Sequence, residues 1–129
     1  MAEIEFLGLD DVLEIHRDQV ERYSGSAGIR DIGLLQSAVA MPAAGFGDQY
    51  LHKDLFEMAA AYLFHITQNH PFIDGNKRTG AVAAIVFLEM NGIELADDED
   101  ELEKLVRGVA MGKSDKMTAA AFFRDNCRE

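Results

Sequence analysis

Apolar residues recur at intervals of three and four along most of this chain, the spacing that places side chains on one face of an α-helix. The first stripe begins at Leu9 and predicts a helix over about residues 10–22. Either Asp10 or Asp11 would cap its start, because a carboxylate can accept from the free backbone N–H groups there. Gly25 marks its end.

A second, shorter helix is expected over Ile32–Ala40. Arg30 and Asp31 are interpreted as a turn and its N-terminal cap, and Pro42 helps to stop it because proline disfavours helical backbone in the residue before it. The stretch Pro42–Tyr50 carries glycines and aromatic residues and predicts a loop or a small β-flap.

The clearest stripe lies between Asp54 and Asn69 and predicts a third helix, which Pro71 ends. From Asn76 to Asn91 the next helix is apolar on nearly every side. Such a helix is normally surrounded by others, so we expect it at the centre of the fold, with Gly92 as a left-handed stop.

Two further helices are expected near the end of the chain. The acids of Asp97–Glu101 would begin a fifth helix and complement its dipole. Its inner face would hold Leu102, Leu105, Val106 and Val109. Thr118 could cap a last short helix that carries Phe122 and Phe123 into the core.

These elements predict an all-α fold, a compact bundle of about six helices around the central apolar helix. Strand signals are confined to Glu3–Phe6, Ile93–Leu95 and the stretch that could form the flap. The chain has 129 residues, of which 48% are hydrophobic and 27% charged, and shows no repeat or low-complexity tract. We therefore expect a single domain over residues 1–129.

The formal net charge of −11 argues against a surface that tracks nucleic acid, which would need cations to neutralise phosphates. Neither a secretion signal nor a run long enough to span a membrane is recognised, and no membrane partner is expected. Cys127 has no cysteine partner, which is consistent with a reducing compartment. A cytoplasmic location is the resulting expectation.

The chemistry of the chain is concentrated in residues 70–80, which read His-Pro-Phe-Ile-Asp-Gly-Asn-Lys-Arg-Thr-Gly. This string combines a proton acceptor, a carboxylate, a glycine turn and two cations immediately before the apolar helix. The free N–H groups and the positive dipole end of that helix would face the same loop. The arrangement predicts a site that handles phosphate.

Each residue type suits one task at such a site. The imidazole of His70, in its neutral form, could accept the proton of an attacking hydroxyl, and Asp74 offers the hard oxygen ligand that Mg²⁺ favours. Gly75 permits the tight backbone path into the helix. The phosphate-binding donors would be the amide of Asn76, the ammonium of Lys77 and the guanidinium of Arg78.

The other histidines give weaker signals. His65 and His70 could suggest a metal pair, but their five-residue spacing across a helix end is poor for shared ligation and no Cys or Glu completes the set. His16 and His52 are interpreted as packing or surface residues.

The string resembles the core motif of the Fic/Doc superfamily, His-Pro-Phe-x-(Asp/Glu)-Gly-Asn-x-Arg. The form with lysine after the asparagine resembles death-on-curing toxins of bacterial toxin–antitoxin pairs. Sequence similarity to these toxins extends over roughly residues 4–125. The resemblance implies the helical fold described above, a nucleotide such as ATP as co-substrate, and Mg²⁺.

The family resemblance also bears on the group that is transferred. Adenylylating members usually carry a glycine and a second arginine where this chain has Lys77 and Ala81. A lysine would crowd the glycine-lined pocket, and the missing arginine removes a clamp on the outer phosphates. Death-on-curing toxins are implied to transfer the terminal phosphate to a protein hydroxyl instead, so kinase action is the first expectation and adenylyl transfer the alternative.

The resemblance further implies a target and a partner. The target would be a translation factor, elongation factor Tu, whose phosphorylation would stop protein synthesis, and the flap Pro42–Tyr50 would align it beside His70. The self-inhibitory segment of many relatives, (Ser/Thr)-x-x-x-Glu-(Gly/Asn), is not recognised here. Inhibition is therefore expected from a cognate antitoxin whose flexible tail folds into a groove of the toxin.

Two readings from other classes stay open. A non-catalytic module could keep this fold only to bind an antitoxin or a nucleotide, although the intact set of His70, Asp74, Asn76 and Arg78 speaks against it. A helical DNA-binding regulator would need a basic recognition face, which the charge balance does not provide.

Overall fold

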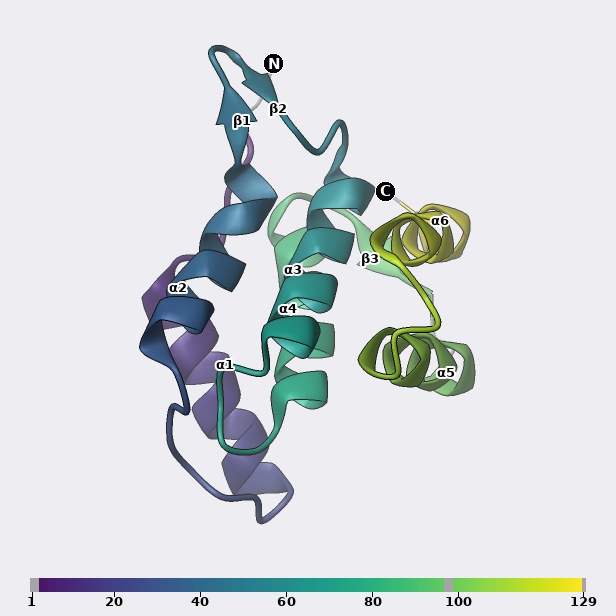
Figure 1. Ribbon diagram of the computed structural model, residues 1–129. Helices are drawn as coiled ribbons and strands as arrows, with labels where there is room; N and C mark the ends of the chain where they lie inside the picture. Colours follow the sequence, from purple (N-terminus) through teal and green to yellow (C-terminus); the bar gives the residue numbers. More distant parts are fainter. Residues whose placement is uncertain (1–2, 97–98, 129) are drawn as a thin grey trace.

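The computed structural model describes residues 3–96 and 99–128, so the predicted acids Asp97 and Asp98 lie outside the described part. The described residues form six α-helices and four two-residue strands (Figure 1). The helices are α1 Leu9–Arg22, α2 Ile32–Ala40, α3 Leu55–Asn69, α4 Asn76–Met90, α5 Glu99–Ala110 and α6 Lys116–Asn126. The prediction of a mostly helical bundle is confirmed.

The centre of the bundle is a pair of helices, α3 and α4, that are joined by the phosphate-handling string and packed against each other. Helices α1 and α2 cover one side of the pair, and α5 and α6 cover the other (Figure 1). The more enclosed member is α3, in which every residue from Met58 to Leu63 is buried. Three successive alanines in that run let neighbouring helices approach closely.

Helix α4 is less enclosed than its apolar sequence predicts. Its residues Ala81, Val82 and Ile85 are only half-buried, because they line a pocket that separates part of α4 from α5. Gly80, on the opposite face, lies against α3: a Cβ there would come within 2.8 Å of Thr67 Oγ1 and 3.2 Å of the Leu63 carbonyl oxygen. A hydrogen at this position lets the two central helices touch.

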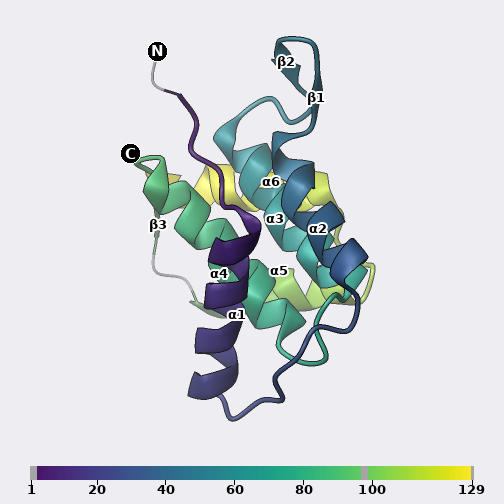
Figure 2. The same cartoon turned by 90° about the vertical axis from the view of Figure 1, so that its left-hand side faces the viewer.

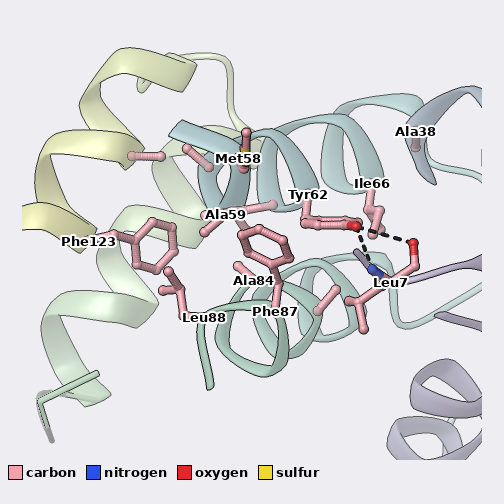
Figure 3. Close-up of a cluster of buried hydrophobic side chains, with 14 of the residues drawn as sticks. Leu7, Ala38, Met58, Ala59, Tyr62, Ile66, Ala84, Phe87, Leu88 and Phe123 are labelled. Carbon is pink, nitrogen blue, oxygen red and sulfur yellow. Dashed lines mark hydrogen bonds between the residues drawn. The ribbon is translucent and has the colours of Figure 1, made fainter. Parts of the chain in front are cut away.

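Aromatic rings fill the space around the central pair. Tyr62 and Phe87 lie with ring centroids 5.2 Å apart, and both are fully buried, as is Phe123 of α6 (Figure 3). The Tyr62 hydroxyl accepts from the Leu7 N–H at 2.8 Å and donates to the Leu7 carbonyl at 3.2 Å. Burial raises the pKa of Tyr62 to about 12. These bonds tie the segment before α1 to the core.

Helix starts differ from prediction in a consistent way. Asp31 caps α2 as expected, accepting from the Leu34 N–H at 2.9 Å. The cap of α1 is Gly8, and Asp11 reaches back to accept the Gly8 N–H at 2.8 Å, so the prediction of Asp10 or Asp11 as the cap is wrong.

For the last helix too, the predicted cap lies three residues after the observed one. Asp115, not Thr118, caps α6, and its carboxylate accepts from both the N–H and the hydroxyl of Thr118 at 2.8 Å. In both helices the predicted residue stands one turn inside the helix. A polar residue at that position bonds to the cap and gives nearly the same sequence signal.

The short strands form two antiparallel pairs. The predicted flap is an antiparallel hairpin of β1 Gly45–Phe46 and β2 Gln49–Tyr50. Strand β3 Glu94–Leu95 pairs with β4 Cys127–Arg128.

The expected strand at Glu3–Phe6 does not form. Instead, the Asn91 side chain bonds both to the N–H of Glu5, at 3.0 Å, and to its carbonyl, at 2.9 Å, and so occupies the place of a partner strand. Gly92 has φ +83°, which confirms the left-handed stop after α4. None of the helices within residues 3–96 and 99–128 has the combination of length and apolarity needed to cross a bilayer.

Candidate phosphate-handling site

The loop from His70 to Gly75 joins α3 to α4 and is held by the main chain of a distant segment. His70 itself has a left-handed backbone, with φ 52° and ψ 51°, which ends α3. The Pro71 carbonyl accepts from the N–H groups of Arg30 and Asp31 at 2.7 and 3.0 Å, and the Ile73 N–H donates to the Gly28 carbonyl at 3.1 Å. Residues 28–31 thus pair with the loop much as a short strand would.

Arg30 also holds the loop with its side chain. Its Nε donates to the His70 carbonyl at 2.6 Å, and its Nη2 donates to the Asn69 carbonyl at 3.0 Å. A cation at the carboxyl end of a helix complements the dipole and satisfies carbonyls that have no partner within the helix. The sequence predicted only a turn at Arg30, because the bonded carbonyls lie about forty residues away.

His16, interpreted from sequence as a packing or surface residue, is buried beneath the loop. Its ring stacks on Phe72, with centroids 3.7 Å apart and planes 6° from parallel. Its Nε2 lies 2.8 Å from the Asp74 carbonyl oxygen, which can only accept, so Nε2 carries the proton. His16 therefore packs, as predicted, and also positions the backbone next to Gly75.

Asn76 closes the loop from the inside. Its Oδ1 accepts from the Phe72 N–H at 2.9 Å and its Nδ2 donates to the Phe72 carbonyl at 3.0 Å, and the side chain is buried. In this arrangement one amide hydrogen is already used within the protein. The contact between the Asn76 amide and a phosphate stays a prediction, and it would fall to the second hydrogen of Nδ2.

Asp74 presents an ionised carboxylate at the mouth of the loop. One oxygen accepts from the Ser26 N–H at 3.0 Å and the other from the Gly75 N–H at 2.8 Å. These two bonds, helped by the nearby charges of Arg78 and His16, lower the pKa of Asp74 below its ordinary value. Each oxygen keeps a further lone pair, so the exposed carboxylate suits a Mg²⁺ ion that takes its other ligands from water and phosphate.

Within the described residues no cluster of three or more His, Cys, Asp or Glu side chains could hold a metal ion. A Mg²⁺ ion at Asp74 would have one protein carboxylate and would take its other ligands from water and from the oxygens of a nucleotide. His65 and His70 do not form a metal pair: His65 Nε2 lies 3.0 Å from Lys116 Nζ, and His70 lies beyond the end of α3.

The first turn of α4 offers an anion site. Gly75 caps the helix with φ 79°, a left-handed conformation that glycine adopts without strain. The Lys77 and Arg78 side chains are both exposed, and the Arg78 guanidinium lies 4.3 Å from the centre of the Tyr23 ring. The stacking on Tyr23 holds the Arg78 guanidinium, whereas no contact of the Lys77 side chain is seen within the described residues.

A pocket of about 920 Å³ brings the predicted residues together. Its lining includes all six of them: His70, Asp74, Gly75, Asn76, Lys77 and Arg78. The exposed His70 side chain thus lines the same pocket as the two cations. The same pocket is lined by residues that sequence reasoning did not assign to it, among them Gln19 of α1, Tyr23 directly after α1, and Glu99, Glu103 and Arg107 of α5. Their approach depends on tertiary packing.

The hairpin lies far from this pocket. It precedes the first residue of α3, whereas His70 follows the last, and the 15 residues of α3 make a helix about 22 Å long. Figure 2 shows the hairpin at one end of the molecule and the α3–α4 turn at the other. The expectation that this flap aligns a target beside His70 is wrong for this structure, because α2 leads the chain away from the loop before the hairpin forms.

Comparison with known proteins is consistent with the fold and the pocket described above. The model of the Fic/DOC family matches residues 6–88, which include α1, α2, the hairpin, α3, the loop and most of α4. The chain belongs to the Fic/DOC family. That span ends before α5, so the family match leaves the second wall of the pocket uncovered.

Two relatives with the name Doc align over most of their length. The chain is 39% identical over 119 residues to a protein of Mycolicibacterium smegmatis named "Toxin Doc", covering 91% of this chain and 89% of the relative. It is 33% identical over 104 residues to a protein of Escherichia phage P1 named "Protein kinase doc", covering 81% of each. The resemblance to Doc-type members of the Fic/DOC family is thereby confirmed.

Proposed function

We propose that this protein is the toxin of a toxin–antitoxin pair and acts as a kinase that transfers the terminal phosphate of a nucleoside triphosphate to a protein hydroxyl. The observation that supports the proposal most strongly is the shared pocket, in which an exposed His70 meets the cations and helix N-terminus of α4. The relatives' names, toxin and protein kinase, point the same way.

The transfer would proceed without a covalent enzyme intermediate. The acceptor hydroxyl forms a bond to the terminal phosphorus while its proton passes to His70, and the bond from that phosphorus to the bridging oxygen breaks to release the nucleoside diphosphate. Lys77, Arg78 and the first N–H groups of α4 would stabilise the negative charge of the phosphate oxygens. Mg²⁺, when bound, would neutralise the phosphate chain, with Asp74 as its protein ligand.

Adenylyl transfer is the alternative within the same family. Lys77 occupies the position of the glycine found in adenylylating members, and Ala81 that of their second arginine. Both departures disfavour a nucleotide whose inner phosphate lies against the helix start. They favour the terminal phosphate as the group that would bind there.

The target proposed for this activity is elongation factor Tu, with inhibition of translation as the result, in the cytoplasm of a bacterium. A cognate antitoxin would restrain the toxin by placing a flexible tail in a groove between its helices. These assignments extend the family resemblance and rest on no separate feature of the chain.

Intact-protein mass spectrometry tests the proposal directly. The chain is incubated with elongation factor Tu, ATP and Mg²⁺, and the mass of the target is measured. A gain of one phosphate supports kinase action, a gain of AMP supports the adenylyltransferase, and no gain from either would contradict an enzymatic role on this target. His70→Ala should abolish the modification while leaving binding of the antitoxin intact.

A further inference from the structure

The wall of the pocket formed by α5 carries one cation, Arg107, for which the motif gives no role. Five residues of α5 line the pocket: Glu99, Leu102, Glu103, Val106 and Arg107. Their spacing of three, one, three and one is that of a single helical face. Arg107 therefore stands on the side of α5 that faces the motif, one turn beyond Glu103.

Across the pocket, α4 has no cation in the turn that follows Arg78. The lining residues there are Ala81, Val82 and Ile85, all apolar. A nucleotide whose terminal phosphate lies at the start of α4 must still neutralise its remaining phosphates. Among the residues of α4 that line this pocket, only Lys77 and Arg78 in the first turn carry positive charge.

Arg107 is free to change partner at low cost. Its Nη2 donates to Glu103 Oε1, an ion pair within the same helix whose side chains are 63% and 67% exposed. Exposed pairs at this spacing contribute only about 0.3–0.5 kcal/mol. A phosphate group carries more charge than a carboxylate and matches the planar guanidinium fork equally well, so it would compete effectively for Arg107.

We propose that Arg107 binds the non-transferred phosphates of the nucleotide and so supplies from α5 the cation that Ala81 does not supply from α4. The inference rests on the proposed phosphotransferase function, and it adds a specificity residue outside the part of the chain that the family model covers. Glu103 would then act as a competitor that Arg107 leaves when nucleotide binds.

The test is a comparison of nucleotide binding and kinetics in four variants. Arg107→Ala should raise the KM and Kd for Mg-ATP about tenfold, the effect of losing one charge-assisted hydrogen bond, with kcat changed less than threefold. The variant should bind adenosine, which carries no phosphate, as well as the wild type binds it. Arg107→Lys should recover part of the loss, because a single ammonium keeps the charge without the fork.

Glu103→Gln should change the affinity for Mg-ATP in the direction opposite to Arg107→Ala. Removing the competing carboxylate should lower the Kd for Mg-ATP several-fold, which a merely structural role for the ion pair would not produce. Lys104→Ala is the matched control, since Lys104 is an exposed cation on the same helix, pairs with Glu101 at 3.3 Å, and does not line the pocket. It should leave the Kd unchanged.

The outcomes separate this inference from the proposed function. If Arg107→Ala binds Mg-ATP as tightly as the wild type while the wild type phosphorylates its target, Arg107 has no such role and the kinase proposal stands. If the wild type binds Mg-ATP but transfers no phosphate, the binding measurements still decide the role of Arg107. If Arg107→Ala and Lys104→Ala weaken Mg-ATP binding equally, the effect comes from the loss of any positive charge on α5, and the inference is overturned.

Discussion

The guanidinium of Arg30 donates to the carbonyl of His70 across 2.6 Å, so the backbone of the proposed general base is held by a residue forty positions earlier. The same side chain reaches the Asn69 carbonyl, and the Arg30 N–H reaches Pro71. The main chain and side chain of Arg30 thus bond to three successive carbonyls, those of Asn69, His70 and Pro71, the last of which also accepts from the Asp31 N–H. The role of Arg30 is to position His70, since the contact is to main chain and not to the imidazole.

Arg30→Ala should lower kcat for phosphate transfer about ten- to a hundredfold, because small displacements of a base from its reacting partner are costly. Arg30→Lys should recover part of the rate, and Arg17→Ala, which removes an exposed cation of α1, should have little effect. Steady-state kinetics are compared with circular dichroism of each variant. An Arg30→Ala protein with normal helicity and normal kcat would contradict the positioning role.

Asn76→Ala should destabilise the protein by about 2–4 kcal/mol, because the N–H and carbonyl of the fully buried Phe72 lose their partners together. Asn76→Asp should also be costly, since the carboxylate can accept from the Phe72 N–H but places a second oxygen against the Phe72 carbonyl. Urea denaturation measures both. Asn126→Ala, which removes a single bond to the Phe122 carbonyl, should cost less; a similar cost for the two alanine variants would argue against a special clamp.

Gly80→Ala should cost about 1–3 kcal/mol, because a methyl group would press on Thr67 Oγ1 and on the Leu63 carbonyl where α3 meets α4. Adding Thr67→Ala should relieve part of this cost, since the Thr67 hydroxyl is buried and makes no hydrogen bond within the described residues. A double-mutant cycle on thermal unfolding gives the coupling. Purely additive effects would show that the two sites do not meet. Gly92→Ala, at φ +83° with open space around it, tests backbone strain alone.

The free energy of unfolding should fall as the pH is lowered from 6.5 to about 4, because of His65, which does not line the pocket. Burial, with the charge of Lys116 and the nearby His52, lowers the pKa of His65 from 6.5 to about 4. The unfolded chain therefore binds more protons than the folded one in this window, and the free energy of unfolding falls as the pH falls through it. Burial and Lys116 also lower the pKa of His52, while the Glu57 charge acts in the opposite direction.

His65→Gln should flatten this pH dependence while keeping an acceptor for the Lys116 ammonium, which donates to His65 Nε2 at 3.0 Å and His52 Nε2 at 3.1 Å. Urea denaturation of the wild type and the variant at several pH values between 7 and about 4 gives the slopes. The account fails if both proteins lose stability at the same rate across the window. His52 should leave the variant a residual slope.

The parts of this structure that follow from sequence are those that depend on near neighbours. The helices came from apolar spacing, and the site residues from a contiguous string, so all six fall in one pocket. What sequence could not show are contacts over long separations. Arg30 bonds to His70 and His16 bonds to Asp74 across 40 and 58 positions, and no local pattern marks such partners.

The hairpin shows a second limit of sequence reasoning. Its strands were predicted from local composition, but its distance from His70 depends on the direction in which α2 and α3 run. The pocket wall formed by α5 could not be predicted for the same reason. The stripe of Leu102 and Val106 predicted an inner face of α5, whereas the role proposed for Arg107 depends on the position of α4 across the pocket. Helix directions and packing angles are properties of the whole core.

The bonds that shape the loop run to the main chain of residues 69–74, and their donors and acceptors come from Arg30, Asp31, Gly28, His16 and Asn76. The imidazole of His70 is thus carried by a frame whose shape does not rely on it. If the protein is the toxin proposed above, truncating the His70 side chain should remove its activity and leave its surface unchanged. Such a variant could then be produced in living cells without an inhibitor and used to capture the protein that binds it.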